Sequence, residues 1–209
     1  MWPEQKGAHV LQVAPDRHHV TANKQDLKRK KAIRIATWNV KTLNVKTQPE
    51  KLENIKKEAK RLGIGMLGMC EMRWIGAGKV QSDDYTIIYS GGQNHEKGVG
   101  MVLDKEHSKS LKGYWPLSDR VLLVKLSAKP LDINIIQTYV PTADSSEEEL
   151  EKFYSEIETA LKHCKSFENT IIQGDFNAKV GQGCSNGNIG SFGLGERNER
   201  GDKLGMGNG

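Results

Sequence analysis

The sequence predicts a mixed α/β (α+β) domain, because short apolar runs typical of strands surround two amphipathic helices. The chain has 209 residues, of which 36% are hydrophobic and 27% charged. That length is enough for one domain with its own hydrophobic core. The apolar runs are bounded by Gly, Asp and Pro, as strands commonly are. The predicted strands cover residues 33–40, 64–71, 85–89, 99–103, 121–126, 133–140 and 170–177.

Two segments carry apolar residues at helical spacing. The first follows Pro49 and ends at Gly63, a common residue pair at the start and the end of a helix. The second begins near Asp144 with acidic residues in its first turn and continues to Leu161. Both segments have one apolar and one charged face, so we expect two amphipathic helices.

The net charge of +5 is concentrated in the first 31 residues, which hold seven Lys/Arg and three Asp/Glu. The cluster Lys28–Lys31 fits a nuclear-import or nucleic-acid-contacting tail, since such charge is attracted to phosphate. It fits a solvated leader equally well. We therefore expect a basic, disordered leader over residues 1–31.

The spacing of the cysteines and the hydropathy of the chain indicate in which cellular compartment the protein is expected. The three cysteines, Cys70, Cys164 and Cys184, are widely spaced, which argues against a disulfide framework or a structural zinc site and favours a reducing compartment. The N-terminus has no apolar signal region, and no stretch is long and apolar enough to cross a bilayer. We expect a nuclear or cytoplasmic protein that is neither secreted nor membrane-bound.

Polar side chains follow three of the predicted strands. They are Asn39, Glu71 and the pair Asp175 and Asn177. Side chains at strand ends converge on one rim of a sheet, where carboxylate oxygens can hold Mg²⁺ and amides can hydrogen-bond a phosphate. Each residue alone is better explained as a turn cap, but the recurrence of all four favours a site.

These residues resemble the ordered motifs of the endonuclease/exonuclease/phosphatase superfamily. The motifs are Thr37-Trp38-Asn39-Val40, Glu71 with Arg73 and Trp74, Gln137-Thr-Tyr139-Val-Pro141 and Gly174-Asp175-Phe176-Asn177-Ala178. Further segments are similar to the endonuclease domain of RTE-type non-LTR retrotransposons and to the related craniofacial development protein 2 family. They are Gly98-Val-Gly-Met-Val, Asp119-Arg120-Val and Gly195-Glu-Arg-Asn-Glu-Arg-Gly201. The resemblance covers about residues 32–204, which leaves residues 205–209 as a tail.

The resemblance implies a four-layer αββα sandwich of the deoxyribonuclease-like type with its site at the rim of the sheets. It implies that Glu71 is the principal Mg²⁺ ligand, with Mn²⁺ as a substitute, and that Asn39 assists it. Asp175 would orient or activate the attacking water, and Asn177 and Tyr139 would bind the scissile phosphate.

Arg73 and Arg120 are candidate contacts to a nucleic-acid backbone, most simply DNA. Charged residues at strand ends are also commonly just solvated, so this second interpretation stays open for both arginines.

Members of the superfamily continue beyond this region with another helix, further strands and a Ser-Asp-His motif, which this sequence does not contain. We therefore expect a C-terminally truncated fold and a DNA-nicking endonuclease that is inactive or weakly active as given. One alternative is a phosphatase or exonuclease of the same superfamily. Another is a non-catalytic nucleic-acid- or chromatin-associated remnant that binds through its basic leader. The sequence leaves the oligomeric state open.

Overall fold

The computed structural model describes residues 9–13, 33–44, 47–179, 181, 195–197 and 201. The chain forms two compact units. Unit 1 comprises residues 1–139 and 155–175, and unit 2 comprises residues 140–154 and 176–209. All the strands described belong to unit 1, which therefore carries the sheet architecture.

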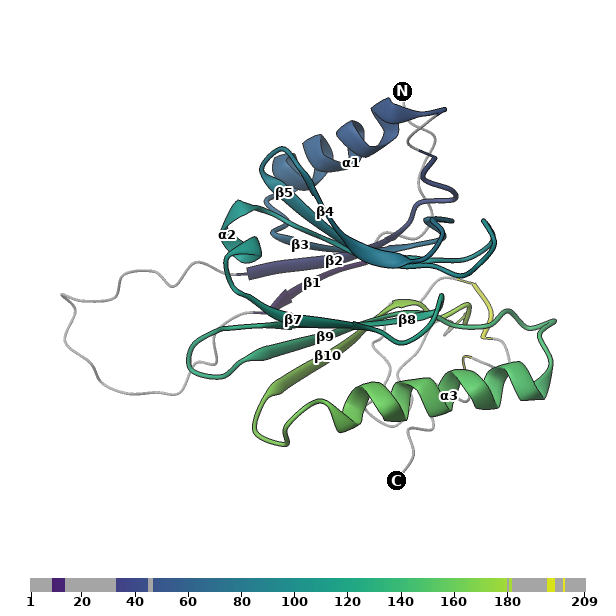
Figure 1. Cartoon of the computed structure of the whole chain (residues 1–209). Coiled ribbons are helices and arrows are strands. Elements are labelled where there is room, and N and C mark those ends of the chain that lie inside the picture. The colour runs from purple at the N-terminus through teal and green to yellow at the C-terminus, as the bar shows by residue number, and fades with distance from the viewer. Residues whose placement is uncertain are drawn as a thin grey trace. The chain divides into compact units, whose positions relative to one another are not determined.

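Sheet A of unit 1 has the strand order β1-β2-β3-β6-β5-β4 (Figure 1). Strands β2 and β3 are parallel, and every other neighbouring pair is antiparallel. The strands are β1 (His9–Val13), β2 (Ile33–Asn39), β3 (Met66–Cys70), β4 (Ala77–Ser82), β5 (Tyr85–Ser90) and β6 (Val99–Leu103).

Sheet B has the order β10-β9-β8-β7. Strands β9 and β10 are parallel, and the other neighbours are antiparallel. The strands are β7 (Leu111–Pro116), β8 (Val121–Leu126), β9 (Ile133–Tyr139) and β10 (Asn169–Asp175). Each sheet thus contains one parallel pair whose carboxyl ends carry predicted site residues.

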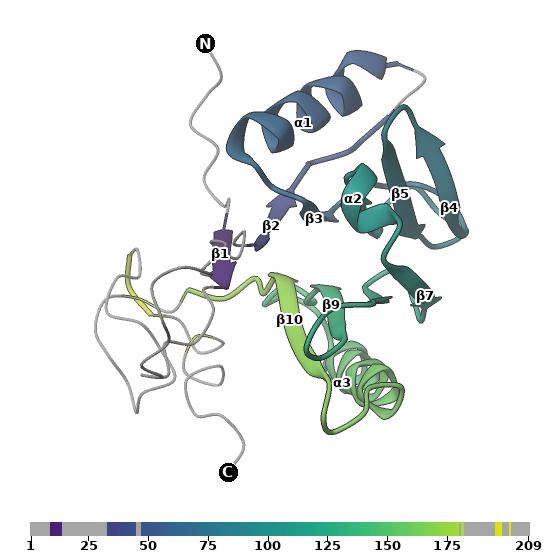
Figure 2. The same cartoon turned by 90° about the vertical axis from the view of Figure 1, so that its left-hand side faces the viewer.

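The two sheets of unit 1 face each other across a shared apolar core (Figure 2). Because successive side chains of a strand point to opposite faces, every second residue enters this layer. Ile35 of β2 and Met66 of β3 meet Leu122, Val124 and Ile135 of sheet B there, all essentially inaccessible to solvent. The alternate residues of β2 and β3 face the other way.

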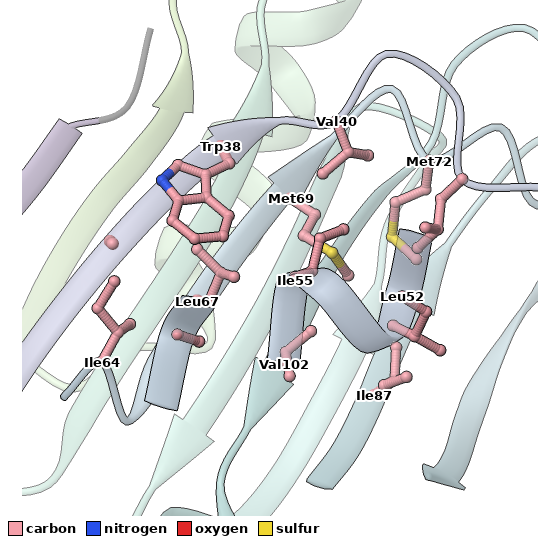
Figure 3. Packing of buried hydrophobic residues seen from close by; sticks show 13 residues of the cluster. Trp38, Val40, Leu52, Ile55, Ile64, Leu67, Met69, Met72, Ile87 and Val102 are labelled. Atoms are coloured by element: carbon pink, nitrogen blue, oxygen red, sulfur yellow. The ribbon is translucent and has the colours of Figure 1, made fainter. Parts of the chain in front are cut away.

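Helix α1 (Pro49–Leu62) covers that outer face of sheet A (Figure 3). Its Leu52 and Ile55 belong to one buried apolar cluster with Leu67 and Met69 of β3. The helix ends at Gly63, whose φ of 66° is a left-handed conformation that favours glycine. Burying one apolar stripe is what fixes a short helix to a sheet.

Helix α3 (Glu147–Lys162) crosses from unit 2 into unit 1. Its second half, from Ser155, belongs to unit 1 and runs beside sheet B, with Ala160 fully buried (Figure 1). The Lys125 ammonium group donates to the His163 carbonyl oxygen at 3.2 Å and so ties β8 to the end of this helix. Unit 1 therefore has the order helix, sheet, sheet, helix.

The predicted strands and helices are all present, and the mixed α+β class is confirmed. Strands β1, β4 and β7 and the short helix α2 (Lys105–Ser108) were not predicted. Strand β4 is mostly exposed, strand β7 is mostly half-buried, and neither has a clear apolar alternation, so the local pattern did not predict them. No helix in the described ranges is both long and apolar enough to cross a membrane.

Strand β1 lies inside residues 1–31, where we expected a disordered leader. It pairs antiparallel with β2, with His9 opposite Thr37 and Val13 opposite Ile33, so the structure differs from that expectation over these residues. The β-branched Val10 and Val13 favour a strand, and the edge of β2 offers backbone partners. The rest of the leader, Cys184 and the tail from residue 205 lie outside the described residues.

Candidate metal and phosphate site

Four of the predicted site residues stand at the carboxyl ends of strands in unit 1. Asn39 ends β2, Tyr139 ends β9 and Asp175 ends β10, while Glu71 directly follows β3. Asn39 lies opposite Cys70 in the β2–β3 pair, and Asp175 lies opposite Tyr139 in the β9–β10 pair. Both parallel pairs, one in each sheet, therefore end in predicted site residues.

The Asn39 side chain connects the two sheets at this rim. Its amide nitrogen donates to Glu71 Oε1 at 2.6 Å and to Asp175 Oδ2 at 2.9 Å. Its oxygen accepts from the Lys41 backbone N–H at 3.0 Å. One neutral amide thus holds two carboxylates that would otherwise repel each other.

Tyr139 donates its hydroxyl to the same Glu71 oxygen at 3.2 Å. Burial, and then the negative charge of Glu71, raise the pKa of the Tyr139 phenol to about 12. The phenol is therefore neutral at physiological pH and keeps its hydrogen for donation.

The backbone at the rim adopts conformations that non-glycine residues rarely take. Glu71 has a φ of 56° and Arg73 a φ of 58°. The Thr42 N–H donates to the Glu71 carbonyl at 2.8 Å, and Lys51 of α1 donates to the Thr42 carbonyl at 2.6 Å. These bonds extend the β2–β3 pairing beyond the strands and hold the strained turn, a feature that concentrates at functional sites.

The two candidate arginines differ in exposure. The Arg73 side chain is 42% exposed, and its Nη2 lies 3.7 Å from Glu71 Oε2. Arg120 is only 8% exposed; its Nη1 donates to the Tyr139 carbonyl at 3.1 Å, and its guanidinium lies 5.3 Å from the Tyr139 ring centroid. Contact with nucleic acid stays a prediction for both, and the more open Arg73 is the better placed.

Asn177 follows β10 but belongs to unit 2. Its amide nitrogen donates to the Val140 carbonyl at 2.6 Å, and its φ is 46°. Asparagine tolerates this left-handed conformation better than most residues. The predicted role of Asn177 in phosphate binding stays a prediction.

The donor groups at the rim fit a hard divalent cation. Magnesium is commonly held by one or two carboxylates while it keeps several waters, and Glu71 and Asp175 supply two carboxylates around one amide. The Glu71 side chain is 18% exposed, so its oxygens are reachable from solvent. Among the residues that the structure describes, no group of three or more His, Cys, Asp or Glu side chains gathers as a metal cage would. The metal assignment therefore rests on this two-carboxylate set.

Sequence reasoning missed a buried polar layer beneath the rim. Thr37, Gln137 and Gln173 are buried between the sheets, each two residues before a predicted site residue. Polar residues at inward positions of otherwise apolar strands were the available signal, since strand alternation places them on the same face as Asn39, Tyr139 and Asp175.

Two facing mixed sheets with carboxylates at their rim define the deoxyribonuclease-like fold, and solved structures share it. The endonuclease domain of TRAS1, a telomere-specific non-LTR retrotransposon, is 18% identical with a TM-score of 0.54, over 84% of this chain and 68% of that one. An AP endonuclease from Archaeoglobus fulgidus is 20% identical with a TM-score of 0.51, over 71% of this chain and 59% of that one. The chain thus has the fold of the endonuclease/exonuclease/phosphatase superfamily of nucleases and phosphodiesterases.

In sequence, the chain is similar to craniofacial development protein 2 from Bos taurus, with 37% identity over 171 residues. The match covers 81% of this chain and 28% of the bovine protein, so the chain spans little more than a quarter of the length of that relative. No protein-family model matches the chain. The predicted resemblance to this superfamily and to craniofacial development protein 2 is confirmed.

Proposed function

We propose that this chain carries metal- and phosphate-binding residues of a Mg²⁺-dependent phosphodiesterase that nicks DNA. The observation that carries the proposal is the Asn39 amide, which bonds a carboxylate from each sheet, Glu71 at 2.6 Å and Asp175 at 2.9 Å. Two carboxylates at one solvent-reachable point are costly without a cation, and a divalent ion would offset their repulsion. The superfamily fold supports this chemistry.

The residues of the rim would divide the work. Glu71, with Asn39, would hold the ion. Bound Mg²⁺ would polarise a phosphate and offset the charge that builds on its oxygens. Asp175 would orient the attacking water and accept its proton, and the neutral Tyr139 hydroxyl would donate to a phosphate oxygen. Phosphate binding by Asn177, which belongs to unit 2, stays a separate prediction.

DNA is the proposed substrate for two reasons. The structural neighbours are named as an AP endonuclease and a retrotransposon endonuclease domain, and both names describe enzymes of nucleic acid. The half-exposed Arg73 guanidinium beside Glu71 also supplies positive charge where a phosphate backbone would approach.

The first experiment measures Mn²⁺ binding by electron paramagnetic resonance in the wild-type chain, Glu71→Gln and Glu58→Gln. Glu58 is a carboxylate on α1 that pairs with Arg61, so it controls for the loss of one negative charge. We expect Glu71→Gln to lower the Mn²⁺ affinity and Glu58→Gln to leave it unchanged. Equal affinities in all three proteins would refute the metal site.

A second experiment tests cleavage. Supercoiled plasmid is incubated with Mg²⁺ and this chain, or with a form extended by the C-terminal part of a superfamily endonuclease domain. We expect weak or no nicking by the chain itself and nicking by the extended form that Glu71→Gln abolishes. Mg²⁺-independent nicking, or nicking that survives Glu71→Gln, would contradict the proposed mechanism.

The same assays distinguish the alternative interpretations. Release of terminal nucleotides or of inorganic phosphate in place of nicks would indicate an exonuclease or a phosphatase. Salt-dependent DNA binding that is lost on removal of residues 1–31 and unaffected by Glu71→Ala, in the absence of cleavage, would indicate a non-catalytic binding protein.

A further inference from the structure

A layer of buried polar side chains lies one step beneath the rim, between the two sheets of unit 1. Gln137 of β9 and Gln173 of β10 are opposite one another in the strand register, as are Tyr139 and Asp175 two residues later. Thr37 of β2 bears the same relation to Asn39. Each buried residue therefore shares a strand face with a site residue.

Hydrogen bonds in this layer run from sheet to sheet. Gln137 Nε2 donates to Thr37 Oγ1 at 3.0 Å and to Cys70 Sγ at 3.1 Å, so sheet B bonds both parallel strands of sheet A. Gln137 Oε1 accepts from Gln173 Nε2 at 3.0 Å. The Gln137 amide thereby uses both of its donor hydrogens and its acceptor, although it is wholly buried.

The backbone of β3 is shaped to receive this amide. A Cβ atom at Gly68 would lie 1.8 Å from Gln137 Oε1, so no side chain larger than hydrogen fits opposite Thr37 in the β2–β3 pair. The neighbouring Cys70 Sγ in turn donates to the Thr138 carbonyl at 3.1 Å. Burial raises the pKa of the Cys70 thiol to about 12, so the thiol keeps its proton for that bond.

The placement of the layer is informative because most of the described side chains between the sheets are apolar. Apolar contacts are non-directional and tolerate small shifts of one sheet against the other, whereas hydrogen bonds between buried amides fix both distance and direction. A buried amide also costs free energy unless it is fully bonded. The polar layer lies directly beneath Asn39. At that point, the register between the two sheets decides whether the Asn39 amide reaches both carboxylates.

We propose that Gln137, held in place by Gln173, is a positioning residue of the rim. It locks sheet A to sheet B so that the Asn39 amide bonds both carboxylates. The expected effect on metal binding rests on the proposed function, whereas the expected effect on the hydrogen bonds of Asn39 does not. The competing account is that the two glutamines contribute only to the stability of the fold.

The test compares Gln137→Met with Asn134→Leu. Methionine keeps the length of the glutamine side chain but removes its hydrogen bonds. Asn134 is a matched control, because it lies on the same strand, is fully buried and bonds Glu168 and Thr170 at the opposite end of β9. Both variants are expected to lower Tm. Only Gln137→Met is expected to disturb the rim.

Two readouts separate positioning from stability. The first is the pair of side-chain NH₂ resonances of Asn39 in the metal-free protein labelled with ¹⁵N-asparagine, which report its bonds to the two carboxylates. We expect them to shift in Gln137→Met and to stay in place in Asn134→Leu. The second is the Mn²⁺ affinity, which should fall about 10-fold in Gln137→Met alone, the scale typical of residues that orient ligands.

Unmoved Asn39 resonances in Gln137→Met, or equal movements in both variants, would overturn the positioning role. Absence of Mn²⁺ binding in the wild-type protein would refute the proposed function but leave the resonance test valid. The two failures are therefore distinguishable.

Discussion

Two carboxylates of unit 1, Glu168 and Glu71, lie in contrasting surroundings. The Glu168 side chain is 4% exposed and bonds the ammonium group of Lys125, itself 11% exposed, at 2.8 Å. Its Oε2 also accepts from Asn134 at 3.0 Å and from the Lys165 backbone N–H at 2.9 Å. Glu71, in contrast, shares the Asn39 amide with a second carboxylate and has its arginine at 3.7 Å.

The difference distinguishes Glu168, a carboxylate that stabilises the fold, from Glu71, a carboxylate that can bind a ligand. The negative charge of Glu168 is already neutralised by the Lys125 ammonium group, so a bound cation would not stabilise it further. Like charges around Glu71 raise the free energy of the folded chain, and a cation can recover that cost.

The largest expected effect is on metal affinity. Glu71→Gln should lower Mn²⁺ affinity about 100-fold, since it removes a ligand and not merely its support. The same substitution should leave Tm unchanged or raise it, because it relieves repulsion with Asp175. Calorimetric titration with Mn²⁺ and thermal scans measure the two quantities, and a marked fall in Tm would remove the contrast with Glu168.

The next effect is on stability. Lys125→Met leaves Glu168 buried without its cation, so we expect Tm to fall by about 10 °C while Mn²⁺ affinity is unchanged. Lys112→Met is the matched control, because it breaks the exposed Lys112–Asp132 pair of the same sheet and should change Tm by about 2 °C or less. Equal losses in Tm would mean that burial does not distinguish the two pairs.

The pH dependence of stability is the third prediction. Hydrogen bonds, first from Lys125, lower the pKa of Glu168 from 4.5 to about 2. Because the folded pKa is the lower one, this carboxylate stabilises the fold above pH 4.5 and the contribution is lost as pH falls toward 2. The difference in Tm between wild type and Glu168→Gln should therefore shrink over that window. A constant difference down to pH 2 would contradict the assignment.

The smallest effect concerns the Tyr139 phenol, whose pKa is raised from 10.0 to about 12. A raised folded pKa means that the phenol stabilises the fold below pH 10 and that this contribution is lost as pH rises toward 12. After a rapid pH jump, the ultraviolet difference between wild type and Tyr139→Phe should titrate near pH 12. A midpoint near 10 would show that Glu71 and burial do not act on this hydroxyl.

Much of the fold was predictable from local patterns. The β-branched run at Ile33, the spacing from Leu52 to Leu62 and the glycine at Gly63 each act within a few residues, and the corresponding elements are present. Strands β4 and β7 were not predictable, because their pairing with β5 and β8 compensates for a weak local pattern.

Which residues end the strands follows from local sequence, because the strand runs and the polar residues after them are adjacent along the chain, as at Asn39, Glu71 and Asp175. The folded chain alone shows that one amide bonds carboxylates from both sheets, and that Gln137 reaches Thr37 across the core. The physical reason is distance along the chain: alternation and capping act locally, whereas the register between two sheets is set by contacts between residues about a hundred positions apart.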